Sequence, residues 1–480
     1  MRAAAVLALA AALFGAYGLG RSGYVGYDTL FGLIWGRDFA RLELPDFAGP
    51  FAPTPHPLLN LVGALLSPLG SAAPQAMEVL GLAATVLLGV AAFRLGRAVG
   101  TPAVGALLAL LLLTRPEPIR LALYSALDIP YIALVLMAAA LEAERSRRGM
   151  PVLALLGLAG LLRPEAWMLA VAYALHAGWH AARRRRAALL VAAAVAPGVW
   201  ILIDVIVTGD LFHSLTGARA AASDRGLPQG VGPALSAVPD FSQQLLGMPI
   251  LIGAGVGAVF AARQARRKMA LPASLGVLAL VPFLAYGLAG SAFFPRYLLP
   301  TAAVLTLLCA IGALGWTALP RGHPRRIPWM VAGGTVTALL LASAPARVGD
   351  LADVRAGVSH RAALEEDLKR LVEEAGGPRA LTGCPHANVP EFRLVPLFQL
   401  WLELPAERFS SRPPGERANG LRVTVPRAAR RSYVLDPLRF DPVRAWQRQR
   451  SPGLPVLARS DAWELAGRCR EPRRVGTAYP

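Results

Sequence analysis

Charged residues are scarce in this sequence. They make up 16% of the 480 residues, whereas hydrophobic residues make up 55%, and the mean hydropathy is +0.47. An ordinary soluble domain carries roughly a quarter charged residues. Several apolar runs, such as 79–92 and 187–207, are long enough with their flanks to cross a bilayer, which takes about 20 apolar residues. The shortage of charge therefore excludes an ordinary soluble protein and predicts a chain that lies mostly in lipid.

Cysteine is nearly absent, with three residues. No Cys/His spacing is typical of a zinc site, and no glycine-rich phosphate loop is evident. Cys309 lies in an apolar run and is expected to be a small buried hydrophobic residue. Cys384 and Cys469 lie in the polar C-terminal part, which we place in an oxidising compartment where a disulfide can form. Two separate thiols are the alternative, because sequence gives no distance between them.

Acidic residues are outnumbered, 30 against 49 basic residues, which leaves a net charge of +19. The position of the basic residues argues against a nucleic-acid partner, because they gather in short loops between apolar runs. Such loops mark the cytoplasmic side of a membrane protein. The clusters are Arg145, Arg147 and Arg148; 183–186; Arg263 and 266–268; and Arg321, Arg325 and Arg326.

Apolar runs and basic loops together predict about eleven transmembrane helices, with the N-terminus inside and the C-terminus outside. The first run resembles a signal peptide, but no small-residue cleavage site follows, so a retained span is expected. The long loops 21–75 and 208–245 then lie outside. The fold class expected for residues 1–345 is therefore an all-α polytopic domain of the cell membrane. The expected spans are 3–20, 76–98, 100–114, 121–141, 150–162, 165–181, 187–207, 246–262, 270–290, 296–318 and 327–345.

The composition changes after residue 345, where charged and proline-rich segments replace the apolar runs. Residues 359–375 have the periodicity of an amphipathic helix, with an apolar stripe of Leu364, Leu368, Leu371 and Val372. Short runs typical of strands follow. We predict that residues 346–480 form a small α/β domain outside the membrane. The expected strands are 379–382, 421–425, 432–435 and 454–457.

The first outer loop carries the first candidate for chemistry. Asp28 follows the first apolar run, where a carboxylate could take a proton from an acceptor hydroxyl. The alternative is an N-cap, because Asp28 precedes a segment of helical character. Arg37 and Asp38 share that helix and could contact substrate or simply pair with each other. His56 precedes Pro57, which indicates a helix start, and is a candidate for substrate contact near the membrane surface.

Further candidates lie in the later outer loops. Glu117 could join Asp28 around a divalent metal or substrate hydroxyls, although two flanking prolines also describe an ordinary tight loop. No metal site is assigned. Glu165 follows Pro164 at a helix start, where the helix dipole favours an anion. Ionisable groups within spans, such as Asp128 and Asp204, are often functional.

Two arginines lie at the outer membrane face beside aromatic residues. Arg163 precedes Pro164, and Arg296 precedes Tyr297 in a Phe-Pro-Arg-Tyr segment. Guanidinium groups form bidentate hydrogen bonds with phosphate oxygens, so both arginines are candidates for binding a lipid phosphate. Tyr297, next to Arg296, is a further candidate for substrate contact. The alternative is that each side chain extends to the interface to keep its charge in water.

Taken in order, these residues resemble the GT-C superfamily of membrane glycosyltransferases, in the branch of protein O-mannosyltransferases and lipid A aminoarabinose transferases. The resemblance implies a polyprenyl-phosphate sugar as donor, Asp28 as the catalytic carboxylate and Arg296 as a phosphate contact. It departs from the O-mannosyltransferases, in which two acidic residues are adjacent, because Asp28 is followed by Thr29. It also lacks the sequon-recognition motif of oligosaccharyltransferases. The segments that carry it are 26–28, 55–58, 163–167, 208–210 and 295–300.

The sequence thus predicts an inverting glycosyltransferase that moves a sugar to a hydroxyl of a glycolipid, a cell-envelope glycan or a protein. Three alternatives stay open. A transporter or flippase of lipid-linked saccharide would show discontinuous helices and repeat symmetry. A polymerase or ligase of surface polysaccharide would place its key loop late in the chain. A non-catalytic scaffold would use Asp28 as a cap alone.

Overall fold

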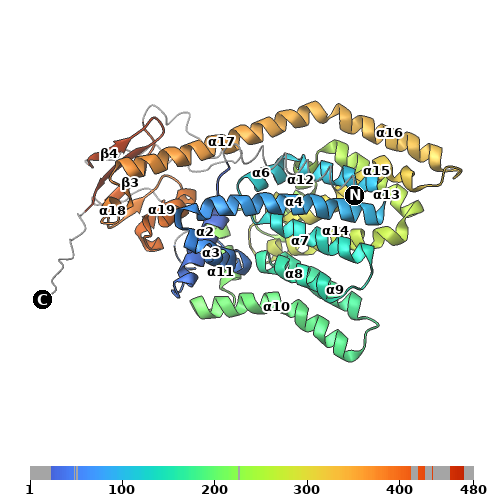
Figure 1. The fold of residues 1–480 in the computed structure, drawn as a ribbon, viewed down its shortest axis with the longest axis horizontal. Coiled ribbons are helices and arrows are strands. Elements are labelled where there is room, and N and C mark those ends of the chain that lie inside the picture. Colours follow the sequence, from blue (N-terminus) through green and yellow to red (C-terminus); the bar gives the residue numbers. More distant parts are fainter. Residues whose placement is uncertain are drawn as a thin grey trace.

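The protein is described here by a computed structural model, which covers residues 23–47, 49, 52–224, 227–411, 420–426, 435 and 454–469. Most of these residues are helical, and a small sheet lies at one end of the molecule (Figure 1). The expected combination of a helical membrane part with a small C-terminal α/β part agrees with this arrangement. The predicted first span, 3–20, lies outside the described residues.

The helical part runs from α2 to α16, and α17 leads from it to the sheet (Figure 1). The order begins with α2 (Tyr27–Ala40), α3 (Pro57–Leu66), η1 (Ser67–Ala72), α4 (Ala73–Val99), α5 (Pro102–Leu113), α6 (Pro116–Leu123), α7 (Asp128–Glu144), α8 (Met150–Leu162), α9 (Glu165–Gly178) and α10 (Arg183–Thr208). It continues with α11 (His213–Asp224), α12 (Val231–Leu246), α13 (Met248–Gln264), α14 (Arg266–Leu288), η2 (Pro295–Leu298), α15 (Leu299–Leu314), η3 (Gly315–Ala318), α16 (Arg326–Ala342) and α17 (Ala344–Glu374).

Within the described residues, four helices are long and apolar enough to cross a membrane, and up to seven if each bent pair counts as one span. The four are Pro57–Val99, Arg183–Thr208, Arg266–Leu288 and Pro295–Ala318. Apolar helices such as α5 and α8 are shorter than a full span. A multi-pass membrane protein is thus supported, whereas the number of eleven spans stays a prediction.

The expected continuous span 121–141 is wrong, because the chain breaks there. Helices α6 and α7 are bent by 119°, and Ser125 between them adopts a left-handed φ of 52°. Backbone carbonyls at this break accept hydrogen bonds from the residues at the start of α2. The Gly26 N–H donates to the Tyr124 carbonyl at 2.8 Å, and the Thr29 hydroxyl donates to the Ser125 carbonyl at 2.8 Å. The break therefore holds the start of α2 beside the start of α7.

Helices α2 and α3 cross at glycines and run in the same direction. A Cβ added at Gly32 would overlap Leu59, and one added at Gly36 would overlap the backbone at Gly63 and Ala64. A step of four residues along α2, from Gly32 to Gly36, thus corresponds to a step of about four residues in the same direction along α3, from Leu59 to Gly63. Glycine lets two helix backbones approach this closely in lipid. One turn back from this crossing, the first turns of α2 and α3 lie side by side.

The segment 208–245, expected as an outer loop, contains two helices, α11 and α12. Asp204 near the end of α10 accepts hydrogen bonds from the backbone N–H and the hydroxyl of Ser214, both at 2.9 Å. The buried carboxylate thereby fixes the turn into α11. Its candidate functional role is accordingly replaced by a local structural one.

The C-terminal part follows α17, whose residues Leu364, Leu368, Leu371 and Val372 are buried as the apolar stripe predicted. Its elements are α18 (Gly377–Leu381), β1 (Ala387–Asn388), η4 (Phe392–Leu394), α19 (Val395–Leu402), η5 (Ala406–Arg408), β2 (Phe409–Ser410), β3 (Gly420–Thr424), β4 (Val456–Arg459) and β5 (Glu464–Arg468). The strand order is β2-β1-β3-β5-β4, with β1 parallel to β2 and β3 and with β5 antiparallel to β3 and β4. An α/β part is confirmed.

Individual elements of this part differ from expectation. The predicted strand 379–382 is wrong, because left-handed turns at Gly376 and Gly377 and the following Pro378 start a short helix instead. Strands near 421–425 and 454–457 are confirmed as β3 and β4, and 432–435 lies, apart from Leu435, outside the described residues. Cys384 and Cys469 form a disulfide, so of the two possibilities left open by the sequence, a disulfide or two separate thiols, the first is confirmed. Cys309 is fully buried, as expected.

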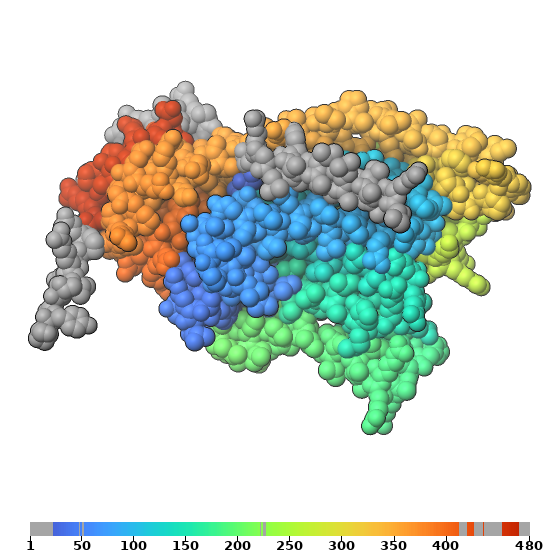
Figure 2. Space-filling view, viewed as in Figure 1, coloured from blue at the N-terminus to red at the C-terminus, as the bar shows by residue number. Residues whose placement is uncertain are grey.

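The C-terminal part packs on the start of the chain. In Figure 2 the orange surface of this part lies against the dark blue surface of the early helices, and α19 contacts α2. The Phe392 ring meets the Tyr27 ring edge-on at 5.4 Å. The contact places this part next to the helix that carries Asp28.

Candidate functional site

A cluster of buried charges lies where α2, α7, α9 and η2 meet. Arg296, from the 3-10 turn that precedes α15, is its centre. Its Nη2 atom is 3.6 Å from Asp28 Oδ2, and its Nη1 atom is 3.9 Å from Asp128 Oδ2. Its Nε atom is buried and has no hydrogen-bond partner among the described residues. One guanidinium thus joins two carboxylates and keeps N–H groups for a further anion.

Arg163 is held entirely by protein groups. It bonds to Asp128, and its Nε donates to Glu165 Oε1 at 3.2 Å. Its guanidinium lies over the rings of Tyr297 at 4.6 Å and Tyr131 at 5.6 Å from their centroids. The Arg163 guanidinium is thus already paired with two carboxylates, Asp128 and Glu165, of this chain. Contact between Arg163 and a lipid phosphate stays a prediction, but Arg296 is the better placed of the two.

Asp28 does not cap its helix, so that alternative is wrong. The N-cap of α2 is Gly26, and its cap is made without a side-chain hydrogen bond. Asp28 lies in the first turn of the helix, where the N-terminal dipole stabilises a carboxylate. Because the cap uses no carboxylate, the Asp28 side chain is available to Arg296. Its side chain is 25% exposed, so a substrate group can reach it.

His56 joins the same site from α3. It is the N-cap of α3 with Pro57 at the first helical position, as the sequence indicated, but its side chain makes no cap hydrogen bond. Because α2 and α3 run in the same direction, His56 lies beside Asp28. Desolvation lowers the pKa of His56 to about 4, against the opposing effect of the Asp28 carboxylate. The ring is therefore neutral at pH 7.

Three predicted site residues lie elsewhere. Arg37 and Asp38 pair with each other at 3.6 Å, about 15 Å along α2 from Asp28 at 1.5 Å per residue. Arg37 also approaches Glu403 of the C-terminal part at 3.5 Å. Glu117 accepts a hydrogen bond from Arg120 Nε at 2.8 Å, an ordinary pair one turn apart on a helix. The structure thus gives Glu117 a local partner, and a contact of Glu117 with substrate beside Asp28 stays a prediction.

Asp128, for which the sequence indicates no specific role, and Tyr131, which it does not single out, both lie in the cluster. Asp128 is 1% exposed and bridges Arg163 and Arg296. The signal for it was present, because an ionisable residue in an apolar span is costly and often functional. Nothing in the sequence distinguished Tyr131 from other tyrosines near span ends.

No group of three or more His, Cys, Asp or Glu side chains that could hold a metal occurs in the described part of the chain. Asp28 and Asp128 are instead joined through Arg296. The arrangement therefore offers a carboxylate and a cation to a substrate without a metal-binding set.

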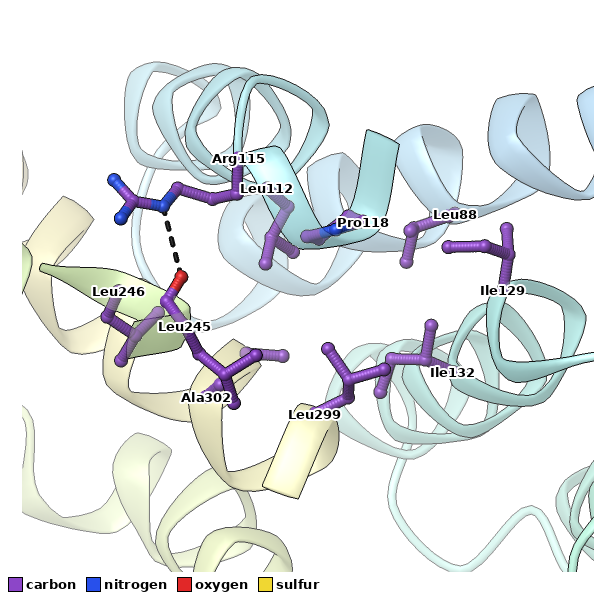
Figure 3. Close-up of a pocket in the computed structure, with 11 residues that line it drawn as sticks. Leu88, Leu112, Arg115, Pro118, Ile129, Ile132, Leu245, Leu246, Leu299 and Ala302 are labelled. Atoms are coloured by element: carbon purple, nitrogen blue, oxygen red, sulfur yellow. Dashed lines mark hydrogen bonds between the residues drawn. The ribbon is translucent and has the colours of Figure 1, made fainter. Parts of the chain in front are cut away.

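A small apolar cavity of about 20 Å³ lies next to the cluster, between α4, α5, α6, α7, α12 and α15 (Figure 3). Its lining includes Ile129 and Leu299, which follow Asp128 and Arg296 along the chain. Arg115 is its one charged lining residue, and the Nε atom donates to the Leu245 carbonyl at 3.2 Å. This volume holds about one water molecule, so the cavity is too small for a lipid chain.

Comparison with solved structures identifies the fold class. A crystal structure of ArnT from Cupriavidus metallidurans bound to undecaprenyl phosphate matches 96% of this chain and 97% of its own, with a TM-score of 0.56 at 14% identity. The apo structure of the same protein matches the same shares, with a TM-score of 0.53 at 15% identity. ArnT is an aminoarabinose transferase of the GT-C superfamily. The chain therefore has a GT-C fold, as the resemblance of its segments implied.

Neither of the two sequence-based comparisons gives a match: no protein-family model and no curated protein sequence aligns with the chain. The fold is thus established at the level of architecture, and the activity has to be argued from the site.

Proposed function

We propose that the protein is a membrane glycosyltransferase that moves a sugar from a polyprenyl-phosphate donor to an acceptor hydroxyl on the extracytoplasmic side. One observation carries the proposal: the Arg296 guanidinium lies 3.6 Å from the Asp28 carboxylate and keeps an unpaired Nε among the described residues. A base and an anion-binding group thus share one partly exposed site. The crystal structure of ArnT with undecaprenyl phosphate, which has the same fold, supports a lipid phosphate as the anion.

Each residue has a role in the transfer step. Asp28 accepts the proton of the acceptor hydroxyl while that oxygen attacks the anomeric carbon. The bond from the anomeric carbon to the phosphate oxygen breaks, and the electron pair leaves with the lipid phosphate. Arg296 binds this phosphate, whose charge grows as the bond breaks. Asp128 and Arg163 hold Arg296 and the start of α7 in place. The donor already contains the energy of a glycosyl-phosphate bond.

The C-terminal part belongs to the same proposal. It lies against α2 through Phe392 and α19, on the side of the membrane where Asp28 lies. We place it outside the cell membrane, where it forms one wall of the acceptor groove with segment 208–245. The Cys384–Cys469 disulfide supports this placement, because disulfides persist in oxidising compartments.

The proposal is tested with purified protein in nanodiscs. Radiolabelled polyprenyl-phosphate sugars are offered as donors, with membrane lipid and cell-wall extract as acceptors, to wild type and to Asp28→Asn. Wild type is expected to transfer sugar, and the folded variant is expected to lose at least a hundredfold in rate, as removal of a general base costs. Activity that survives in Asp28→Asn would move the base to another carboxylate.

A flippase is the second candidate, and one observation favours it. Helices α6 and α7, and α12 and α13, are bent against each other by 119° and 105°. Broken helices of this kind also surround transporter sites. Movement of labelled donor across a liposome membrane without sugar transfer would support the flippase.

A further inference from the structure

Several buried polar atoms near Asp28 have no partner within the protein, and they converge on one place. Among the described residues, and besides Arg296 Nε, these unpartnered atoms include His56 Nδ1, both amide atoms of Asn60, and Trp200 Nε1. The Asn60 and Trp200 residues are 2% and 3% exposed. Native proteins rarely leave such a group without a hydrogen bond, because the desolvation of the buried polar atom is then not compensated. The described residues provide no hydrogen-bond partner for the polar atoms of these three side chains.

The three side chains come from neighbouring helices. His56 and Asn60 are four residues apart, and the Asn60 N–H donates to the His56 carbonyl at 2.9 Å, so both belong to the first turn of α3. Side chains at this spacing lie on one face of a helix. Helix α3 packs against α10, and the His56 ring meets the Trp200 ring edge-on at 5.8 Å. His56 in turn lies beside Asp28.

A neighbouring tryptophan shows what an ordinary structural indole does here. The Trp167 ring packs on Trp200 at 5.6 Å, and its Nε1 donates to the Gly160 carbonyl at 3.0 Å. Its polar atom is thus satisfied by the backbone. Trp200, deeper in the same packing, has no such acceptor among the residues described. The contrast points to a group that the protein itself does not supply.

We propose that His56, Asn60 and Trp200 form a subsite for a sugar ring. The set provides an indole N–H donor, an amide that both donates and accepts, and a neutral imidazole. Sugar hydroxyls also both donate and accept, so adjacent hydroxyls on one ring match this set. A phosphate does not, because it only accepts, and the carbonyl oxygen of the Asn60 amide is itself an acceptor that needs a donor. The subsite lies beside Asp28, where the sugar has to be for transfer.

This inference rests on the proposed transfer of sugar and adds where the ring is recognised. The ring belongs either to the donor or to the acceptor, and the two sources present the same hydroxyl chemistry. The kinetic constants separate them, because a lost contact to the donor sugar raises the KM for donor alone, and a lost contact to the acceptor raises the KM for acceptor alone.

The test uses Asn60→Leu, which removes the amide at nearly constant shape, and Trp200→Phe, which removes the indole N–H together with part of the ring. Trp167→Phe makes the same change in shape at a neighbouring tryptophan and is the matched control. Each purified variant is assayed for KM of donor, KM of acceptor, inhibition by bare polyprenyl phosphate, and Tm. Both subsite variants are expected to raise one of the two KM values about tenfold, the effect of one lost hydrogen bond to a ligand. Inhibition by the bare lipid and the KM values of Trp167→Phe are expected to stay at the wild-type level.

Two outcomes would overturn the subsite. Equal weakening of the bare lipid and of the lipid-linked sugar would assign these residues to the phosphate. Unchanged KM values in both variants would mean that a buried water alone satisfies the three side chains.

If wild type transfers no sugar at all, the proposed function fails while the subsite is still tested by native mass spectrometry. Preference of wild type for lipid-linked sugar over bare lipid, lost in Trp200→Phe, would support it. Equal binding of both lipids by wild type would exclude the donor sugar, and the subsite would be overturned if, in addition, Trp200→Phe bound acceptor glycan as well as wild type does.

Discussion

Arg296 lies 3.6 Å from Asp28, although 267 residues separate them in the chain and each begins a different helix. The pair forms because the break between α6 and α7 receives the start of α2, and because Asp128, which opens α7, reaches the same guanidinium. The cation is shared by one partly exposed and one buried carboxylate. The two carboxylates therefore have different expected functions, chemistry for Asp28 and structure for Asp128.

Replacing Asp128 by Asn is expected to unfold the site, whereas Asp28→Asn keeps the fold. Asp128 is 1% exposed and is bonded to Arg163, so its loss leaves a buried guanidinium with less charge compensation. Breaking a buried ion pair from one side costs about 3–5 kcal/mol. Thermal unfolding in detergent is expected to show a clearly lower Tm for Asp128→Asn and a nearly unchanged one for Asp28→Asn. Equal Tm values would contradict this division of roles.

The glycine crossing between α2 and α3 is expected to control activity from a distance. A Cβ at Gly63 would collide with the Gly32 carbonyl oxygen, so Gly63→Ala has to push the two helices apart. Overpacking of this kind costs about 1–3 kcal/mol, and it also separates Asp28 from His56. Transfer activity is expected to fall more than tenfold, about the effect of misplacing reacting groups by a fraction of an ångström.

Gly157 in α8 is the matched control for this change. An added Cβ there meets no atom within 4 Å, so Gly157→Ala is expected to be neutral or slightly stabilising. Activity and Tm of both variants are measured side by side. A fully active Gly63→Ala protein would show that the crossing does not set the geometry of the site.

The parts of this fold that the sequence predicted depend on local patterns. The helix start at Pro57, the apolar stripe of α17 and the burial of Cys309 follow from residues close together in the chain. The pairing of Asp128 with Arg163 and of Arg37 with Glu403 depends on contacts between distant helices. Glu117 illustrates the local side of this limit, because its hydrogen-bond partner in the structure is Arg120, one turn away on the same helix. The position of Asp28 after the first apolar run makes it a candidate from the sequence alone, but only the structure shows that it pairs with Arg296.

The disulfide between Cys384 and Cys469 is expected to stabilise the C-terminal part strongly. It joins residues 85 positions apart, so it shortens a long loop in the unfolded chain. Removing a native disulfide typically costs about 2–5 kcal/mol. The double variant Cys384→Ala, Cys469→Ala is therefore expected to be cleaved faster by protease in this part. Denatured, non-reduced wild type is expected to show one free thiol, Cys309, and three thiols would contradict the pairing.

The contact between Glu403 and α2 is expected to weaken in acid. Arg41 Nη1 donates to Glu403 Oε2 at 3.0 Å, and this hydrogen bond lowers the pKa of Glu403 below its usual range. A carboxylate whose folded pKa is lowered adds stability above its unfolded pKa of about 4.3 and loses it as the pH falls through the folded pKa. The Tm difference between wild type and Glu403→Gln is thus expected to be present at pH 7, to shrink below the unfolded pKa, and to vanish once the pH is below the folded pKa of Glu403.

The exposure of the Glu403 side chain limits how large the Tm difference between wild type and Glu403→Gln can be. The Glu403 side chain is 52% exposed, and exposed ion pairs contribute about 0.2–1 kcal/mol. A double-variant cycle with Arg41→Gln isolates the pair, because Arg41→Gln in the Glu403→Gln background is expected to cost nothing further. Arg459→Gln is the matched control, since Arg459 pairs with Glu464 inside the C-terminal part at 3.0 Å and not with α2. If Glu403→Gln lowers Tm equally at pH 7 and in acid below the folded pKa of Glu403, its effect is not the charge, and the ion pair does not hold the C-terminal part on α2.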